Sequence, residues 1–465
     1  MPDDSTTAAV LAAIAVAVFT CALFGAAARA LRQPPVIGQI LAGIALGPSL
    51  LGRLPGDPAA SLFPAHVLPF LAMLGQVAVT VFMFSVGHEL TAHRRQAAGR
   101  AVATVTVGAL AVPMGLGAAT AVLGRTGFGS AGETAAGSGT FVLFMALAVA
   151  VTALPVLAAI VRDRGLDGTR AGTVALASSG LMDAVAWFAL AAITLGAGTT
   201  AGRHSGAKEM GLRIVLLLAL AAALLGVVRP LLRRWMRSSV TVPYHLPVAF
   251  ALAAGAAAAT TALGLHAVFG GLLAGAAMPH LHEGPEPDSV PSSGRAPVPF
   301  LTAAIHAVEH LFLPLFFVTT GLALDVGSLR LDDFVLLVVL CAVACAGKLG
   351  GGYLGARVGG LPRQASATVA VLLNTRGLTE LIALNLGLAS GIIHKRLFTV
   401  LVLMAVITTL MTSPLLSALG HRANSRRSRG SGPGEPATAS ASTDADPAAV
   451  RRIQAAVRPR GPGRA

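Results

Sequence analysis

Charged residues are scarce in this chain, and so are the residue types that build most catalytic centres. Of its 465 residues, 12% are Asp, Glu, Lys or Arg, and the chain has only two tryptophans and two tyrosines. The three cysteines, Cys21, Cys341 and Cys345, lie in apolar runs and offer neither a disulfide framework nor paired metal-ligand spacing. The sequence also has no histidine–cysteine cluster, no serine–histidine arrangement and no glycine-rich nucleotide motif. These absences speak against a metal centre and a hydrolase, and we expect neither enzymatic activity nor a cofactor.

Apolar sequence is abundant: 55% of the residues are hydrophobic, and the 53 glycines suit close helix packing in lipid. Long apolar runs with few charges are typical of helical membrane proteins. Met1–Thr7 carry two acids and no base, so we interpret the first apolar run as a retained span rather than a secretory signal. We predict an all-α integral membrane protein with about 13 transmembrane helices. The predicted spans are 8–31, 35–51, 67–89, 101–124, 139–161, 171–197, 210–235, 245–262, 264–279, 299–322, 333–356, 364–391 and 397–419.

The net charge of +14 would suggest nucleic acid as the partner of a soluble protein, but here the positive charges sort by loop. With the N-terminus outside, arginines gather in the inner loops, as at 94–95, 162–164 and 233–234. The outer loops hold fewer basic residues, even when the arginine-rich C-terminal segment is not counted. The positive-inside rule therefore predicts a multi-pass protein of the cytoplasmic (inner) membrane, with its N-terminus outside and its C-terminus in the cytoplasm. Its surroundings are the lipid bilayer, and we expect no nucleic-acid partner.

A weak internal repeat relates the two halves of the chain. Residues 36–43 and 268–275 are identical at five of eight positions. In the span that follows each, Phe82, Gly87 and Leu90 match Phe316, Gly321 and Leu324. Chance is the alternative in a chain so rich in Ala, Gly and Leu, but the nearly constant offset argues against it. An odd number of spans separates the copies, which turns the second upside down, and inverted repeats place substrate sites at the midplane where the halves meet.

Polar, helix-breaking stretches interrupt one predicted span in each half. Thr152 and Pro155 interrupt the span at 139–161. The span at 364–391 is interrupted by Asn374, Thr375, Arg376, Gly377 and Glu380. Irregular backbone within a membrane is tolerated only where it lines a cavity or is buried in protein. We therefore predict two broken helices that cross at the midplane.

Asp183 is the carboxylate around which we predict the functional site. It lies far from either end of the span at 171–197, and a carboxylate at that depth is costly and by default functional. A carboxylate can hold a small cation or a proton but not both, which is what exchanging one for the other requires. With Thr152 and Ser179 as further oxygen donors, we predict an ion- and proton-binding site. The alternative is an aspartate bonded to nearby backbone or to Ser178 and Ser179.

Three further charges within predicted spans, Lys348, Arg376 and Glu380, bear on the site. We interpret Lys348 as a charge partner of Asp183, although a lysine at this position could instead snorkel to the inner surface. Arg376 and Glu380 are four residues apart and so share one helical face. We interpret them as a pair that neutralises the helix-dipole ends at the breaks, which is structural support rather than ion binding.

Four stretches resemble the monovalent cation:proton antiporter-2 family, which includes Kef-type potassium efflux systems and plant cation/proton exchangers. QPPVIGQILAGIALGPSLLG at 33–52 resembles the second span of that family. The stretches that resemble the plant exchangers in particular are VTALPVLAAIVRDRGL at 151–166, LPLFFVTTGLALDV at 313–326 and NTRGLTELIALNLG at 374–387. The similarity extends over nearly the whole predicted membrane part.

The resemblance implies a homodimer in which an ion-transporting core moves against a dimerisation domain. Residues 8–89 and 245–322 would form the dimerisation domain, and 101–197 and 333–419 the core. The helix at 210–235 would link them. From its Arg-, Ser-, Gly- and Pro-rich composition, we interpret 420–465 as a disordered cytosolic tail.

Carried over by position, Asp183 matches the family's ion-binding aspartate, Lys348 its membrane-buried base, and Thr152 and Pro155 its first broken helix. The residue before the aspartate is commonly Asp, Asn or Gln in these antiporters, and here it is Met182. A thioether is a poor ligand for a hard alkali cation. The site would then keep a single titrating carboxylate, and we expect one-for-one, electroneutral exchange. Sodium and potassium both stay open as the transported ion, with weak coordination slightly favouring potassium.

The sequence thus predicts a secondary active antiporter that exchanges K+ or Na+ for H+ by alternating access, with Asp183 binding each in turn. A channel-like potassium pathway is one alternative, against which the absence of a nucleotide-binding regulatory domain in the sequence weighs. A carrier of an organic ion is another. A third is a degenerate transporter that acts in sensing or scaffolding, for which Met182 is the only support.

Overall fold

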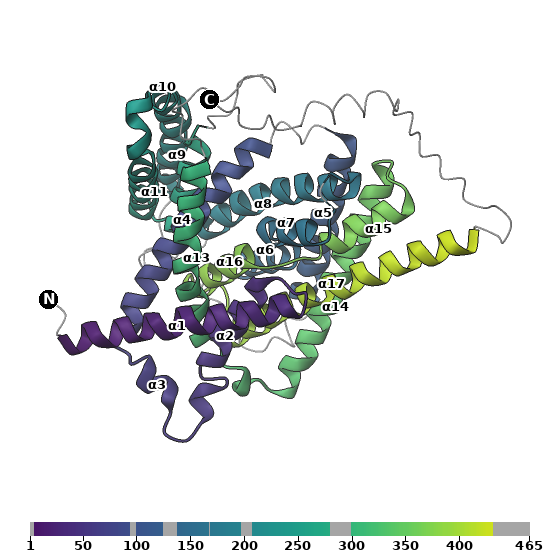
Figure 1. Cartoon of the computed structure of the whole chain (residues 1–465), viewed down its shortest axis with the longest axis horizontal. Coiled ribbons are helices and arrows are strands. Elements are labelled where there is room, and N and C mark those ends of the chain that lie inside the picture. Colours follow the sequence, from purple (N-terminus) through teal and green to yellow (C-terminus); the bar gives the residue numbers. More distant parts are fainter. Residues whose placement is uncertain are drawn as a thin grey trace, which may run out of the picture. The chain divides into compact units, whose positions relative to one another are not determined.

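The computed structural model describes residues 4–93, 99–123, 137–166, 168–196, 207–279 and 299–430. The chain divides into two units, Met1–Leu419 and Gly420–Ala465. Apart from the last residues of α17, the described helices all belong to the first unit. Within the described ranges, every regular element is a helix (Figure 1).

The helices follow the predicted spans closely. Their bounds are α1 (Asp4–Ala30), α2 (Pro35–Leu46), α3 (Pro58–Leu62), α4 (Leu68–His93), α5 (Arg100–Leu123), α6 (Ser138–Ala150), α7 (Leu154–Asp163), α8 (Arg170–Gly196), α9 (Ala207–Ala223), α10 (Arg229–Trp235), α11 (His245–Ala262), α12 (Ala267–Ala277), α13 (Pro299–Leu322), α14 (Leu331–Val358), α15 (Arg363–Leu372), α16 (Leu378–Ala389) and α17 (Lys395–Gly430). Eleven of the described segments are long and apolar enough to cross a membrane, and Ala267–Ala277 and Leu378–Ala389 are shorter apolar helices. The prediction of an all-α membrane protein is confirmed.

The end of the last helix differs from the boundary that we predict between membrane part and tail. We place the tail at 420–465, whereas α17 continues to Gly430. No proline interrupts the chain between Pro414 and Gly430, so the helix has no steric reason to stop earlier. Residues 431–465 lie outside the described residues.

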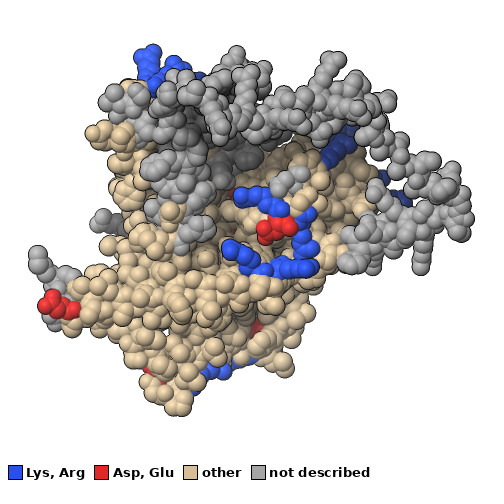
Figure 2. Space-filling view, in the orientation of Figure 1, with Lys and Arg blue, Asp and Glu red and all other residues tan. Residues whose placement is uncertain are grey.

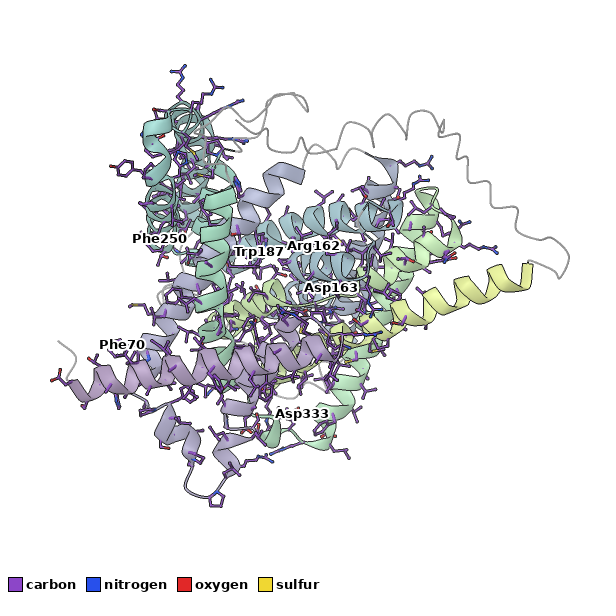
Figure 3. All side chains as sticks on the ribbon, in the orientation of Figure 1. Phe70, Arg162, Asp163, Trp187, Phe250 and Asp333 are labelled. Carbon is purple, nitrogen blue, oxygen red and sulfur yellow. The ribbon has the colours of Figure 1, made fainter. Side chains whose placement is uncertain are left out.

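Most of the described surface is uncharged, as a lipid-facing chain requires. Large apolar side chains are widely exposed on it, and Figure 3 shows two of them, Phe70 of α4 and Phe250 of α11. On the face in Figure 2, one group of Lys and Arg surrounds a carboxylate, and other Lys and Arg lie near the upper and lower edges of the view. In the same orientation Figure 3 labels Arg162 and Asp163 in the group around the carboxylate, at the end of α7, where we predict an inner loop.

A glycine contact joins α2 of the first half to α13 of the second. A Cβ atom added to Gly43 would overlap the carbonyl oxygen of Phe317, and one added to Gly321 would overlap the backbone of Gly43. The two backbones are therefore in direct contact, which no residue with a side chain would permit. Such small-residue contacts are typical of helices packed within a membrane.

A second glycine contact joins α4 of the first half to α12 of the second. Here a Cβ atom on Gly275 would overlap the carbonyl oxygen of Phe84, and one on Gly87 would overlap that of Leu272. In the predicted repeat, Gly275 is the counterpart of Gly43, and Gly321 is the counterpart of Gly87. The two contacts are thus built from the same pair of positions with the halves exchanged, as an inverted repeat requires.

A second group of helices packs around α5 and α14, which also meet at two glycines. A Cβ atom on Gly351 would overlap the carbonyl oxygen of Gly108. α5 also packs against α6 and α8, and α15 packs against α14 and α8. This group of helices holds both breaks and Asp183.

We predict that Gly321→Ala destabilises the protein, because the added methyl group meets backbone that cannot turn away. Overpacking of this kind costs about 1–3 kcal/mol, which thermal unfolding of the purified protein in detergent would detect as a lower Tm. Gly255→Ala in α11 is the matched control, because its Cβ would meet nothing within 4 Å. Equal Tm values for the two variants would contradict the close contact.

Candidate functional site

The two predicted breaks are present and touch each other. α6 ends at Ala150, the chain is extended over 151–153, and α7 starts at Leu154 with Pro155 in its first turn. Proline suits this position, since its missing N–H would have no helical partner there. In the other half, α15 ends at Leu372 and α16 begins at Leu378.

Hydrogen bonds between the two interrupted stretches, 151–153 and 373–377, hold the crossing together. The Ala153 N–H donates to the Thr375 carbonyl at 3.2 Å. The Thr152 hydroxyl donates to the Leu373 carbonyl, also at 3.2 Å. Asn374 turns the other way, and its side-chain amide donates to the Thr408 carbonyl at 3.1 Å. Each break thus supplies partners for backbone groups that the other leaves without helical bonds.

Arg376 supports the first broken helix. Its Nη1 donates to Glu380 Oε1 at 2.7 Å and to the Ala148 carbonyl at 2.7 Å, and its Nη2 donates to the Val149 carbonyl. Both charged side chains are completely buried. The predicted pairing of Arg376 with Glu380 is present, and the guanidinium also caps the last carbonyls of α6, where the helix dipole is negative. The main-chain N–H of Arg376 donates to Thr409 Oγ1 at 2.8 Å, which holds the second break against α17.

Asp183 lies buried on α8, facing the start of α7. Its Oδ2 accepts a hydrogen bond from the Leu154 N–H at 3.2 Å, at the positive end of the α7 dipole. Its Oδ1 has no hydrogen-bond partner among the described residues. Ser179, one helical turn earlier, also has a buried hydroxyl with no described partner, whereas Ser178 donates to the Val102 carbonyl at 3.4 Å. Asp183 is therefore anchored to backbone through one oxygen, while its other oxygen is available to bind an ion or a proton.

Lys348 of α14 is completely buried, which argues against snorkelling. Its Nζ donates to Thr152 Oγ1 at 2.5 Å and approaches Met182 Sδ at 3.9 Å. The lysine and Asp183 are near enough for an electrostatic interaction. In this conformation, however, the described hydrogen bonds of Lys348 go to Thr152 and Met182 rather than to Asp183. Thr152 thus connects the lysine to the crossing, because its own hydroxyl proton goes to Leu373.

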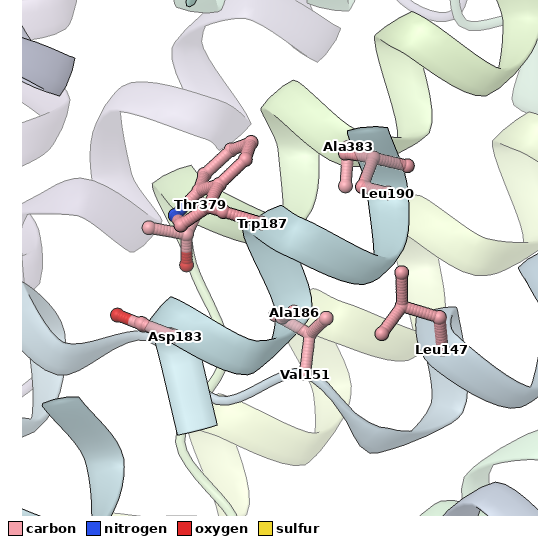
Figure 4. A pocket seen from close by; sticks show the side chains of 8 residues that line it. All are labelled: Leu147, Val151, Asp183, Ala186, Trp187, Leu190, Thr379 and Ala383. Carbon is pink, nitrogen blue, oxygen red and sulfur yellow. The ribbon is translucent and has the colours of Figure 1, made fainter. Parts of the chain in front are cut away.

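A small cavity opens beside Asp183 (Figure 4). Its walls are formed by Leu147, Val151, Asp183, Ala186, Trp187, Leu190, Thr379 and Ala383. The cavity has a volume of about 10 Å³, which is about the room that one water molecule needs. The Trp187 indole packs edge-on against Phe269 of α12 at 6.3 Å between ring centres. This cavity therefore brings together residues of both broken helices, from α6 and α16, with residues of the unbroken helix α8.

Thr379 is a polar residue of this cavity that the sequence analysis does not single out. It belongs to the interrupted stretch at 374–380, where Arg376 and Glu380 draw attention as charges. The missed signal is positional: Thr379 is the second residue of a helix that starts within the membrane. A hydroxyl at that place cannot reach back to a preceding helical turn, and so it is left for another partner.

We predict that Arg376→Met is strongly destabilising, because it leaves Glu380 as an uncompensated buried charge and two α6 carbonyls without a donor. Breaking a buried pair from one side costs about 3–5 kcal/mol. Thermal unfolding of Arg376→Met, Glu380→Met and the double variant forms a cycle that isolates the pair. The double variant should lose clearly less than the sum of the two single losses. Additive losses would mean that the two charges do not depend on each other.

Proteins of similar sequence identify the family. Residues 15–419 match the sodium/hydrogen exchanger family, transmembrane. The chain is 34% identical over 418 residues to Na(+)/H(+) antiporter NhaS4 of Synechocystis sp., a match that covers 89% of this chain and 98% of that protein. It is 31% identical over 418 residues to cation/H(+) antiporter 20 of Arabidopsis thaliana. That second match covers 87% of this chain and 47% of the plant protein, so the chain spans about half of that relative's length.

A solved structure with a similar fold agrees with these matches. The sodium proton antiporter MjNhaP1 from Methanocaldococcus jannaschii, at pH 8, aligns with a TM-score of 0.56 at 14% identity. The alignment covers 89% of this chain and all of that one. At this identity the likeness shows the fold alone. From the match over residues 15–419 and the relationship to NhaS4, we conclude that the chain belongs to the transmembrane sodium/hydrogen exchanger family.

Proposed function

We propose that this protein is a secondary active antiporter that exchanges a monovalent cation, K+ or Na+, for H+ by alternating access. The observation that supports this most directly is the Oδ1 atom of Asp183, a buried carboxylate oxygen with no described partner beside a small cavity. The names of the relatives, Na(+)/H(+) antiporter and cation/H(+) antiporter, point to the same class of activity.

The proposed exchange depends on competition at a single oxygen. With a proton on Oδ1, Asp183 is neutral, and the cost of burying a charge in apolar surroundings is avoided. A dehydrated cation at Oδ1 requires the ionised carboxylate, so the proton has to leave before the cation binds. The Leu154 N–H bond to Oδ2 keeps the carboxyl group in place in both states. Only a loaded site, carrying the cation or the proton, would then cross between the two sides.

Met182 supports one-for-one exchange. Its side chain is buried and its sulfur lies 3.9 Å from Lys348 Nζ, so a thioether stands where a carboxylate would offer a second ionisable group. The lysine is held by Thr152 instead. With one carboxylate in the site, we propose that one cation is exchanged for one proton and that the cycle moves no net charge.

The packing is consistent with the proposed division into two domains. The residues that form the α2–α13 and α4–α12 glycine contacts lie within 8–89 and 245–322, the proposed dimerisation domain. The helices around α5 and α14 lie within 101–197 and 333–419, the proposed mobile core. We propose that two copies associate in the cytoplasmic membrane, with the N-terminus outside and the C-terminus in the cytoplasm, as the arginine distribution indicates.

We predict that Asp183→Asn abolishes exchange. Proteoliposomes holding a pH gradient would be given sodium, potassium or lithium, and the collapse of the gradient would be recorded by a pH-sensitive dye. The wild type should respond to at least one of these cations and Asp183→Asn to none. Asp163→Asn is the matched control, since it removes an exposed aspartate at the end of α7 and should leave the response unchanged.

Three results would contradict this proposal. A wild type that ignores every alkali cation would favour an organic-ion carrier or a degenerate transporter. Cation flux without proton counterflow would favour a channel. A fully active Asp183→Asn protein would remove the carboxylate from the mechanism.

We further predict that the exchange rate does not depend on membrane potential. Moving one net charge across 100 mV is worth about 2.3 kcal/mol, which would change the rate several-fold or more. Initial rates would be compared at zero potential and at 100 mV of either sign, set by a thiocyanate gradient in liposomes that contain only this protein. A clear dependence on voltage would mean that the numbers of cations and protons exchanged are unequal, so that each cycle moves net charge.

A further inference from the structure

Thr379 shares the cavity of Asp183 but comes from the opposite half of the protein. It is the second residue of α16, behind the second break, whereas Asp183 is on α8. Both line the same small cavity. In Figure 4 the hydroxyl oxygen of Thr379 points to the side of the cavity where the Asp183 carboxylate lies.

The hydroxyl of Thr379 has no hydrogen-bond partner among the described residues, although its side chain is only 2% exposed. Two buried threonines on the unbroken helix α17 bond within that helix: Thr408 donates to the Met404 carbonyl, and Thr399 donates to the Lys395 carbonyl. The break explains the difference. Four residues before Thr379 is Thr375, whose carbonyl lies outside the helix and accepts the Ala153 N–H. The crossing of the two broken helices thus leaves Thr379 without the usual intrahelical bond.

A buried polar group without a partner is costly, and such groups are retained in native proteins where something else binds them. The cavity has room for about one water-sized sphere. A cation that enters must therefore shed most of its water, and protein oxygens have to replace it. Among the buried oxygens without a described partner, Asp183 Oδ1 and Thr379 Oγ1 belong to residues that line this cavity, and Ser179 Oγ lies one helical turn before Asp183. The walls are otherwise apolar.

We propose that Thr379 is a direct ligand of the transported alkali cation, supplied by the second broken helix to complete the site at Asp183. The inference rests on the proposed function and adds a ligand and its role to it. The cation would lie between the two halves, bound by a carboxylate oxygen from α8 and a neutral hydroxyl oxygen from α16. The proton needs no such ligand, because a protonated carboxyl group is complete without one. Thr379 therefore acts on cation affinity and on the choice among alkali cations, and not on proton affinity.

The test compares Thr379→Val, which keeps the shape and removes the oxygen, with Thr379→Ser, which keeps the oxygen. Exchange would be measured in proteoliposomes as a function of cation concentration and of pH. We expect Thr379→Val to raise the KM for the cation about tenfold or more, as loss of a bond to a charged group implies. The pH dependence of exchange should be unchanged when each variant is measured at the same ratio of cation concentration to its own KM, and Thr379→Ser should be close to the wild type. Thr399→Val, which removes a buried hydroxyl bonded within its own helix, is the control and should leave the KM unchanged.

A second measurement covers the case in which Thr379→Val stops exchange altogether. Binding of sodium, potassium or lithium to the purified protein would then be followed by calorimetry, with Thr379→Ala in place of Thr379→Val if the latter does not fold. Weakened binding supports the proposal. Unchanged binding, an unchanged KM or an equal loss in Thr399→Val overturns it. A wild type that exchanges cations while Thr379→Val has the same KM defeats this inference alone, whereas a wild type without exchange defeats the proposed function.

Discussion

A membrane offers no water to backbone groups that have lost their helical partners, and the structure depends on how this constraint is met. Two helices are interrupted where they cross, and the carbonyls at the end of α6 would be left without donors. The guanidinium of Arg376 supplies those donors. Glu380 balances the charge of Arg376, which bonds to Glu380 and to the α6 carbonyls at the same time. The hydrogen bond from the Ala153 N–H to the Thr375 carbonyl then joins the two interrupted stretches. Everything proposed for Asp183 requires this arrangement, because Leu154, which anchors the carboxylate, is the first residue after the break.

Few charged side chains among the described residues are buried where the two broken helices cross. Within the described part of the chain, the charged side chains at the crossing are Asp183, Lys348, Arg376 and Glu380. Arg376 and Glu380 are bonded to each other and to backbone, which leaves Asp183 and Lys348 as the charges that can respond to an ion. Met182, beside Asp183 in the sequence, contributes a thioether rather than a further charge. In the proposed mechanism, a single carboxylate and neutral oxygens would therefore bind the cation.

Much of the fold could be predicted from the sequence because its signals are strong in a membrane. Apolar runs of fixed length set the spans, and polar residues with proline or glycine inside such runs marked the breaks at 151–153 and 373–377. Charged residues at depth were conspicuous for the same reason, so Asp183, Lys348, Arg376 and Glu380 could be chosen without a structure. The spacing of Arg376 and Glu380 was enough to predict their contact.

What the sequence could not provide was the direction of individual hydrogen bonds. Thr152 and Asn374 both looked like site residues, but one holds Lys348 and the other bonds to α17. Lys348 was expected at Asp183, yet its hydrogen bonds in this conformation go elsewhere, since a lysine chain can reach several acceptors from one backbone position. Thr379 was passed over because threonine in an apolar span is ordinary. Its importance appears only when the crossing shows that its intrahelical acceptor is already used.

The exchanged glycine contacts bear on how the protein is made. α2 packs its glycine face on α13, and α12 packs on α4, so each close contact joins a helix made early to one made late. While the ribosome is still synthesising the first half, α2 can already pack against α1, but Gly43 of α2 and Gly87 of α4 do not yet have the partners that they contact in the complete protein. The contact at Gly43 forms only after residues 299–322 have been inserted. The α2–α13 and α4–α12 contacts are therefore late events in its synthesis, whereas contacts within one half, such as α5 with α6 and α14 with α15, can form earlier.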